Sequence, residues 1–436
     1  MSRRREGGET SVHGASGSRP NDPIVVVGAG AAGFMAAIFA ARAARGASGA
    51  AAGGPEVLLL ERTRDGGKKI LMSGGGRCNV LPSVLDPRLY VTESSPNTLK
   101  KMLLSWPLEE QRRFFEVEMG LRLALEEETG KLFPASNTAK DVRDGLRAIA
   151  VRDGVGVRFE TTVTGLEPGW RVLLADGGSI RASAVLLATG GLSVPATGSD
   201  GTGFEIARRL GHTLHATYPA LTPLTAGPHR YAALSGVSLV VTLEAPGPKR
   251  TWSVRGGFLF THKGYSGPSV LNLSHLAVRS RLAGAPPQRF FVRWTDLDAA
   301  AWERLLREGE GTVGGLLRRH VPARLAEALL EDVAVDAATP LAQLGRESRR
   351  RVVEAMTHHP LPWTGDEGYV KAEVTGGGVD LAEVDPRTLE SRLHPGLYLC
   401  GEILDAFGPI GGYNFAWAWA TGRAAGTAAL RATSTA

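Results

Sequence analysis

The sequence predicts an α/β fold in which a nucleotide-binding domain is divided by an insert. Three observations support this. A β-branched run, a glycine turn and an alanine-rich helix stand near the start; short alternating runs fill the middle; a strand–glycine turn–helix pattern returns at the end. With 436 residues, 43% of them hydrophobic, the chain is long enough for two or three domains around a large core.

The first of these patterns is a βαβ unit. The β-branched run Ile24–Val27 predicts a buried parallel strand, and Phe34–Arg45 predicts a helix. A small-residue loop, residues 46–55, leads to a second parallel strand, Val57–Leu60. Residues 1–22 are polar and are expected to form a disordered leader.

The turn inside this unit has the spacing of a dinucleotide site. Gly28 allows the tight turn, Gly30 lets the backbone approach a pyrophosphate, and Gly33 allows close helix packing. Ala32, in the same motif, is also an expected contact, because the helix amino terminus favours phosphate. Glu61 ends the second strand, where a carboxylate binds ribose hydroxyls and repels a 2′-phosphate, which leaves FAD and NAD as candidates.

A second motif, residues 68–79, lies in a glycine-rich loop expected over residues 62–79. Successive glycines, Gly75 among them, let the backbone fold around an anion. Arg77 can bind that anion through two N–H groups, and Asn79 offers a donor and an acceptor. A flexible surface loop is the alternative, but the position after the second strand favours a cofactor role.

Two further glycine motifs follow predicted strands. Thr189 and Gly190 end an apolar strand, and Gly401 and Glu402 end another. Residues 411–414, with Gly412, precede a helix whose positive end would stabilise a reduced flavin. One extended dinucleotide could touch all these motifs, which favours FAD over NAD and requires the insert to loop out between them.

The rest of the chain divides by its periodicity. Helices are expected at 97–120 and 138–152, and strands at 155–159, 171–174 and 180–187. The predicted domain boundaries are 23–195 for the first part of the nucleotide domain, 196–295 for a β-rich insert, 296–360 for a helical sub-insert, 361–372 for a return to the β-rich insert, and 373–436 for the second part.

Composition excludes several classes of protein. The formal charge of +6 is interleaved with acids, so no nucleic-acid or membrane partner is expected; the predicted partner is a small-molecule substrate, and the chain a monomer or small homo-oligomer. Cys78 and Cys400 are too few for a disulfide framework, which suits a cytoplasmic protein, although a redox pair is an alternative. The pair His358-His359 has no partners at metal-ligand spacing, so no metal is expected.

Six strings in the chain carry a family resemblance. GAGAAG, KKILMSGGGRCN, ATGG, FTHKGYSGP, TGGGV and GEILDAFGPIGGYN resemble the BaiN/YhiN-like family of NAD(P)/FAD-dependent oxidoreductases, also described as aminoacetone-oxidase-like flavoproteins, over roughly residues 24 to 430. The resemblance implies a two-part FAD-binding domain of the glutathione-reductase type, with an inserted β-barrel and a helical sub-insert. It also implies FAD contacts at Arg62, Val163 and Asn414, beside the residues named above.

The reaction is predicted only by class. We expect hydride transfer between a small organic substrate, or NAD(P)H as a transient donor, and the flavin. A reductase or dehydrogenase is favoured; an oxidase of an amine-type substrate and a non-catalytic FAD-binding sensor are the alternatives. His262, Tyr265 and Tyr413 stand near family-like strings and are candidate proton donors, or alternatively structural residues.

Overall fold

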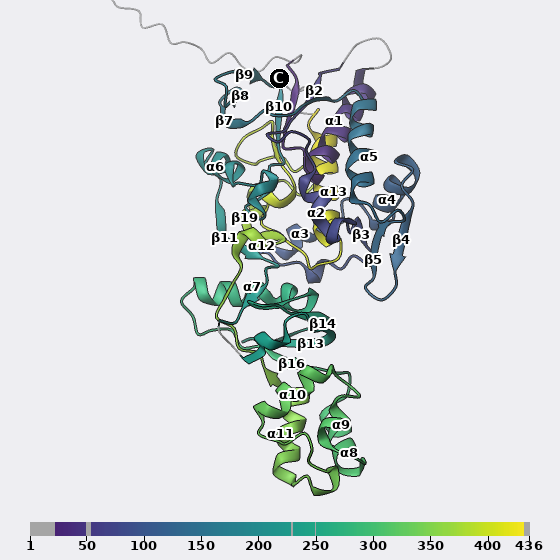
Figure 1. The fold of residues 1–436 in the computed structure, drawn as a ribbon. Helices are drawn as coiled ribbons and strands as arrows, with labels where there is room; N and C mark the ends of the chain where they lie inside the picture. Colours follow the sequence, from purple (N-terminus) through teal and green to yellow (C-terminus); the bar gives the residue numbers. More distant parts are fainter. Residues whose placement is uncertain (1–21, 49–53, 228–229, 249, 431–436) are drawn as a thin grey trace, which may run out of the picture.

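The computed structural model describes residues 22–48, 54–227, 230–248 and 250–430. The expected disordered leader therefore lies outside these ranges except for its last residue. Figure 1 shows three bodies in a row: a parallel-sheet body at one end, a second sheet in the middle and a group of helices at the far end.

The parallel-sheet body is built around five strands in the order β20-β10-β1-β2-β6. Their bounds are β1 (Ile24–Val27), β2 (Val57–Leu60), β6 (Gly156–Arg158), β10 (Ala184–Leu187) and β20 (Leu397–Leu399). Every pairing is parallel, and β1, β2, β10 and β20 are fully buried, as expected of strands covered on both faces. The strand nearest the C-terminus thus pairs with a strand from the first half of the chain.

Two helices pack side by side against this sheet. They are α1 (Ala31–Ser48) and α13 (Tyr413–Ala428). Glycine is needed where they cross, since a Cβ at Gly426 would lie 2.1 Å from the Ala36 carbonyl oxygen and one at Gly422 would lie 2.5 Å from that of Ala32. The C-terminal helix therefore fixes the position of the helix that follows the glycine turn.

The remaining elements of this body are short. Its helices are α2 (Lys68–Met72), α3 (Pro96–Leu103), α4 (Leu108–Arg113), α5 (Ala139–Arg152) and α6 (Thr202–Arg209). Two antiparallel sheets flank it, one of β3 (Leu81–Pro82), β5 (Lys131–Pro134) and β4 (Leu123–Glu126), the other of β7 (Val163–Glu167), β8 (Arg171–Leu174) and β9 (Ser179–Arg181).

Several predicted boundaries were wrong in detail. The helix expected over 97–120 is broken between α3 and α4, where Pro107 lacks an amide hydrogen and disfavours helical geometry in the residue before it. The strand expected over 180–187 is divided between β9 and β10. The loop expected over 62–79 contains α2 and a 3₁₀ turn, Ser73–Gly76.

The middle body is a seven-stranded sheet in the order β17-β16-β13-β14-β15-β12-β18. Its strands are β12 (Leu224–Thr225), β13 (Ser238–Pro246), β14 (Thr251–Phe260), β15 (Gly264–Ser266), β16 (Phe291–Arg293), β17 (His359–Pro360) and β18 (Gly365–Asp366). The pairing runs from β17 to β18, so we describe this body as a sheet, and the closed barrel implied by the family resemblance stays a prediction.

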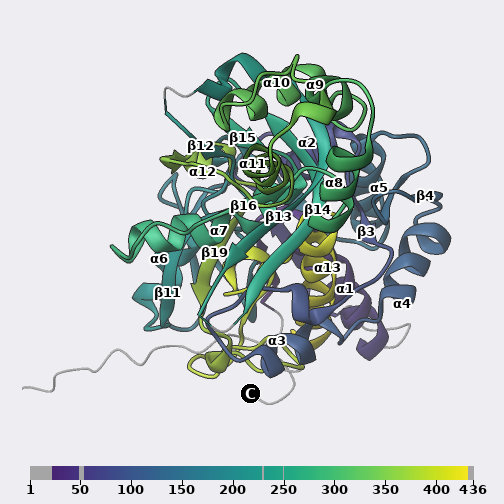
Figure 2. The same ribbon diagram turned by 90° about the horizontal axis from the view of Figure 1, so that it is seen from below.

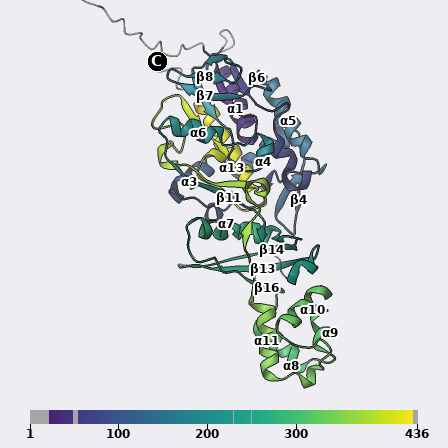
Figure 3. The ribbon, with the colours of Figure 1, turned by 60° about the vertical axis from the view of Figure 1, so that its left-hand side comes forward.

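A helix missed by the sequence analysis, α7 (Pro268–Leu282), packs on this sheet and on β11 (Leu214–Ala220). Strand β11 pairs with β19 (Val374–Val379) and so links the middle body to the parallel-sheet body, next to the short helix α12 (Gly368–Lys371). Figure 3 shows the sheet edge-on between α7 and the far helices.

The far helices form a module with its own apolar contacts. They are α8 (Ala299–Glu308), α9 (Val313–Leu317), α10 (Ala323–Asp332) and α11 (Arg346–Thr357). Trp302, Leu306 and Leu329 are fully buried and belong to one core with the sheet. Figure 2, seen from the helical end, places these helices in front of β13 and β14. In the part of the chain that the structure describes, none of the helices combines the length and the apolar character needed to span a bilayer.

Candidate cofactor site

A cavity of about 590 Å³ lies at the carboxyl ends of β1, β2, β10 and β20, where ligands bind in open parallel sheets. Its far wall includes Leu271 of α7, so it reaches the insert. The predicted contacts that line it are Gly28, Gly30, Ala32, Glu61, Arg62, Gly75, Arg77, Asn79, Val163, Thr189, Gly190, Gly401, Glu402, Gly412 and Asn414. Motifs spread over the whole sequence thus face one space.

The glycine turn divides its tasks as its spacing predicts. Gly28 has a φ of +101°, and a Cβ there would lie 2.6 Å from the Ala188 carbonyl oxygen. A Cβ at Gly30 would meet nothing within 4 Å, because this glycine borders the open cavity. Gly33 does not line the cavity; a Cβ there would lie 1.7 Å from the Gly28 carbonyl oxygen, so its role is packing.

Glu61 fastens this turn to the second strand. Its Oε2 accepts from the Ala29 amide at 2.7 Å, and its Oε1 accepts from the Thr63 amide at 2.8 Å. The residue is only 7% exposed, and each carboxylate oxygen keeps capacity for a further hydrogen bond. The neighbouring Arg62 is paired with Asp200, which also borders the cavity. Glu61 therefore supports the turn as well as facing the space beyond it.

The glycine loop after the second strand is held in left-handed backbone. Gly74, Gly75 and Gly76 have φ of +56°, +67° and +87°, values that favour glycine. The Arg77 guanidinium lies 3.9 Å from the ring centre of Phe133 and pairs with Glu126 at 3.1 Å. The predicted anion-binding arginine thus has two protein partners of its own.

Two polar atoms at the cavity lack a protein partner. Within the described ranges, Asn79 Oδ1 and Thr189 Oγ1 are buried and make no hydrogen bond. Both residues line the cavity. Buried polar groups are nearly always satisfied, so the unpaired Asn79 Oδ1 fits a site that takes its missing hydrogen bond from a ligand. Asn79 Oδ1 and the open face of Gly30 fit a dinucleotide such as FAD, whereas Thr189 Oγ1 packs against Gly203 of α6, where a Cβ would lie 1.8 Å from it.

Glu402 is the centre of a network that joins four distant segments. Its Oε2 accepts from Lys69 Nζ at 2.7 Å, and its Oε1 accepts from Ser193 Oγ at 2.8 Å and from the Thr375 amide at 3.0 Å. Lys69 Nζ also donates to Ser193 Oγ at 2.6 Å. Glu402, an expected cofactor contact, is thus largely occupied by protein donors.

Asn414 also has a structural task. Its side-chain amide accepts from the Gly408 amide at 2.8 Å and donates to the Gly408 carbonyl at 2.9 Å. The preceding Gly412 has a φ of +91°, and a Cβ there would lie 2.5 Å from the Leu81 carbonyl carbon. Asn414 therefore holds the loop that leads to the amino terminus of α13.

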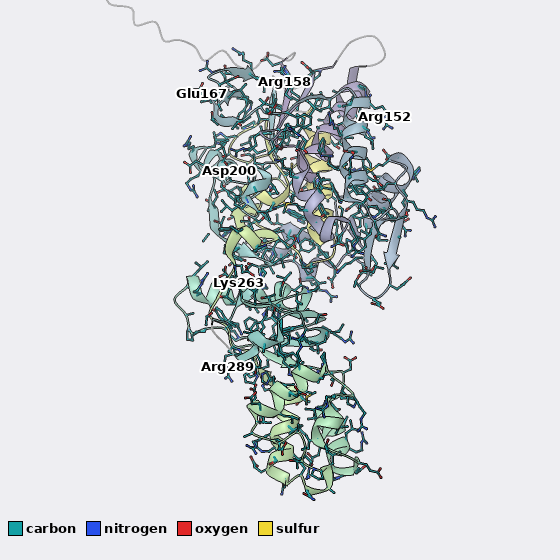
Figure 4. All side chains as sticks on the ribbon, viewed as in Figure 1. Arg152, Arg158, Glu167, Asp200, Lys263 and Arg289 are labelled. Atoms are coloured by element: carbon teal, nitrogen blue, oxygen red, sulfur yellow. The ribbon has the colours of Figure 1, made fainter. Side chains whose placement is uncertain are left out.

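None of the three candidate proton donors lines the cavity. His262 is exposed between β14 and β15, and Figure 4 shows the neighbouring Lys263 on the insert. Tyr265 is fully buried in the core of the insert, with its ring 5.7 Å from that of Phe258. Tyr413 is half-buried beside Tyr90, whose hydroxyl donates to its carbonyl. The three residues were chosen because they stand near motifs in the sequence, but the fold does not place their side chains at the cavity.

The two cysteines are buried and reduced. Burial raises the pKa of the Cys78 thiol and of the Cys400 thiol to about 12 in each case. A thiol with such a pKa stays protonated at neutral pH and is a poor nucleophile. Both cysteines therefore pack as small apolar residues.

Three residues at the site were not assigned a role from the sequence. Lys69 and Glu373 line the cavity, and Ser193, which does not line it, joins Lys69 in the network around Glu402. Two signals were present: the lysine pair that opens the second motif, and an acidic residue directly before β19. Neither signal indicates by itself which residues meet in space.

The fold and cavity define a nucleotide-binding α/β protein of the Rossmann type. The chain matches the family described as HI0933-like protein Rossmann domain over residues 22–428, and it belongs to this family. It thus has a Rossmann-type FAD-binding fold and is a member of a family of FAD-dependent oxidoreductases.

Two relatives are similar over nearly their whole length. One is the 3-dehydro-bile acid delta(4,6)-reductase of Clostridium scindens, 33% identical over 93% of this chain and 98% of the relative. Another is the ribosomal RNA dihydrouridine synthase of Escherichia coli, 31% identical over 91% of this chain and 95% of the relative. A solved 3-ketosteroid delta1-dehydrogenase from Sterolibacterium denitrificans is 13% identical, with 96% of this chain and all of that chain covered and a TM-score of 0.49.

Proposed function

We propose that the protein is an FAD-dependent reductase or dehydrogenase that transfers hydride between bound flavin and a small organic substrate. The observation that carries the proposal is one cavity lined by residues from Val27 to Ala418, in which the buried Asn79 Oδ1 has no hydrogen-bond partner among the described residues. NAD(P)H is the proposed transient donor, which recharges the flavin.

The cavity residues divide along the length of such a ligand. Gly28, Gly30 and Ala32, with Glu61 and Val163, are proposed to hold the adenosine and diphosphate. The proposed contacts to the rest of the cofactor are Arg62, Gly75, Arg77, Asn79, Thr189, Gly190, Gly401, Glu402, Gly412 and Asn414. Bound FAD supplies the hydride chemistry, while the chain supplies orientation, charge and exclusion of water.

The proposed substrate is a double bond conjugated to a carbonyl. The names of both curated relatives describe the reduction of an unsaturated compound, one a bile-acid derivative and the other uridine in RNA. The apolar wall that Leu221, Leu271 and Ile410 add to the cavity fits a small organic molecule. This supports a reductase over an oxidase.

One observation favours a second candidate substrate, a base in RNA. Between residues 214 and 295 the insert has nine lysines and arginines and one acidic residue, Glu244. Such an excess of positive charge would attract the phosphate backbone of RNA. The net excess is smaller than the count indicates, because four of the basic residues pair with acids from outside this segment: Arg255, Lys263, Arg279 and Arg281. The small substrate therefore stays the first candidate.

The test is anaerobic mixing with NADH or NADPH while the flavin band near 450 nm is followed. We expect yellow protein that bleaches with a reduced nicotinamide and recovers its colour with 2-cyclohexen-1-one. Bleaching only with an amine would indicate an oxidase, and no bleaching with any donor would indicate a sensor. Protein that is colourless and does not take up added FAD contradicts the proposal. Recovery with uridine-containing RNA alone would select the second substrate.

A further inference from the structure

Four carboxylates line the cavity, and three of them are occupied by protein partners. Glu61 accepts from two backbone amides. Asp200 pairs with Arg62 and accepts from Thr202. Glu402 accepts from Lys69, Ser193 and the Thr375 amide. The fourth carboxylate belongs to Glu373, and within the described residues no hydrogen bond or ion pair engages it.

The backbone of Glu373 is nevertheless fixed. Its amide donates to the Leu221 carbonyl at 3.2 Å, and its carbonyl accepts from Ser193 Oγ at 3.4 Å. These contacts hold it where β19 begins, between the parallel-sheet body and the insert. The side chain is exposed and borders the cavity, so its raised pKa comes from protein atoms packed around the carboxyl and not from complete exclusion of water. A fixed backbone with a free carboxyl is the arrangement expected of a group that acts on a ligand.

The surroundings of Glu373 shift its carboxyl toward the protonated form. Burial raises the pKa of Glu373, and the charge of Lys69 acts in the opposite direction as the smaller effect. The Lys69 charge is already compensated, because its Nζ lies 2.7 Å from Glu402 Oε2. The exposed Lys371 of α12, two residues before Glu373, also lines the cavity. A flavin in the cavity would remove more water from the carboxyl and raise its pKa further.

We propose that Glu373 is the acid–base catalytic residue of this site. This inference rests on the proposed function and deepens it. In the reducing direction the Glu373 O–H bond breaks and a C–H bond forms at the substrate carbon next to the carbonyl. The hydride, which carries both electrons, reaches the other carbon of the double bond and derives from NAD(P)H by way of the cofactor. The Glu373 carboxylate then regains its proton from water at the cavity mouth.

Lys69 and Glu402 are positioning residues in this arrangement. Their ion pair and Ser193 fix the lysine ammonium against Glu402, so that most of its charge is compensated there. A free ammonium group beside Glu373 would favour its ionised form and lower its strength as an acid.

The first test needs no substrate. The absorption spectrum of the bound flavin is recorded as a function of pH for wild type, Glu373→Gln and Glu347→Gln, the last a control on the exposed surface of α11. We expect one spectral transition in wild type, at a pH above the usual glutamate range of about 4 to 5. It should persist in the control and vanish in Glu373→Gln. A transition that survives in Glu373→Gln, or is missing from wild type, overturns the assignment.

The second test separates proton delivery from electron transfer. Reduced protein is mixed with 2-cyclohexen-1-one, which needs a proton on carbon, or with ferricyanide, which takes electrons alone. In Glu373→Gln we expect enone reduction to slow by about 10²- to 10⁴-fold, with ferricyanide reduction and flavin bleaching by NAD(P)H within about threefold of wild type. Glu373→Asp should recover part of the lost rate.

The outcomes distinguish the two proposals. Wild-type protein that binds no FAD, or passes no electrons to the enone, defeats the proposed function, and the role of Glu373 falls with it. Wild type and Glu373→Gln that reduce the enone equally fast overturn the role of Glu373 and leave the proposed function intact. A variant that loses FAD or slows equally with both acceptors shows a structural residue and also overturns it.

Discussion

The two ends of the cavity are built in different ways. At the glycine-turn end, Glu61 bonds to Ala29 and Thr63, so the contacts stay within one βαβ unit. At the opposite end, Lys69, Ser193 and Glu402 come from segments up to 333 residues apart in the sequence. The first end is organised locally, whereas the second forms only when the whole chain has folded and carries the carboxyl of Glu373.

Among the variants that test the difference between the two ends, Gly30→Asp is expected to have the largest effect, a loss of FAD affinity. A Cβ at this position meets no protein atom within 4 Å, so the fold should persist, but the aspartate charge would face the proposed diphosphate. We expect FAD affinity to fall by about 100-fold or more. The measurement is FAD titration followed by fluorescence quenching, with circular dichroism to check the fold.

A matched variant at the same motif should act on the fold instead. Gly33→Ala places a Cβ 1.7 Å from the Gly28 carbonyl oxygen, a clash that destabilises by about 1–3 kcal/mol or more. Gly30→Asp protein that binds FAD normally, or Gly33→Ala protein as stable as wild type, would show that the two glycines do not have these separate roles.

The second prediction concerns the opposite end. Lys69→Met leaves the Glu402 carboxylate, whose side chain is 16% exposed, without its cation. We expect a loss of about 1–3 kcal/mol in the free energy of unfolding, measured with urea. Adding Glu402→Gln should recover part of this loss, because the uncompensated charge is then removed. A double variant that is less stable than the sum of the two single losses contradicts the pairing.

The difference between the locally built end and the end built from remote segments also explains which features the sequence could predict. The role of Gly33 depends on a contact with Gly28 inside one motif, which spacing alone reveals, whereas the close contact of Gly28 is with the remote Ala188. The gap between α3 and α4 could have been predicted too, because Pro107 marks it. The network of Lys69 and Glu402 depends on how remote segments meet, and no local pattern encodes that. His262 shows the opposite error. A local motif drew attention to this residue, but the motif belongs to the insert and the side chain does not line the cavity.

The third prediction uses the pH dependence of stability. Burial raises the folded-state pKa of Glu373, so the folded protein binds this proton more tightly than the unfolded chain does. The stabilisation is complete at low pH and is lost as pH rises through the folded-state pKa. Glu373→Gln should therefore gain stability relative to wild type as pH increases from about 4. The measurement is urea unfolding at several pH values.

Glu347 provides a control of opposite sign. Its hydrogen bond to Arg350 lowers the pKa of its exposed carboxyl, so Glu347→Gln should lose stability relative to wild type as pH rises through the acidic range. If Glu373→Gln and Glu347→Gln respond to pH in the same direction, the two carboxyls do not occupy the contrasting environments described here.

The smallest effect is expected at His262. This side chain is exposed on the insert and does not line the cavity, although the string around it resembles a family motif. His262→Ala should leave FAD affinity and the rate of enone reduction within about twofold of wild type, as for most surface substitutions. The measurement is the same stopped-flow assay in which Glu373→Gln slows. A tenfold loss in His262→Ala would mean that the insert moves this residue to the cavity during turnover, so that the reacting end is completed only when substrate binds.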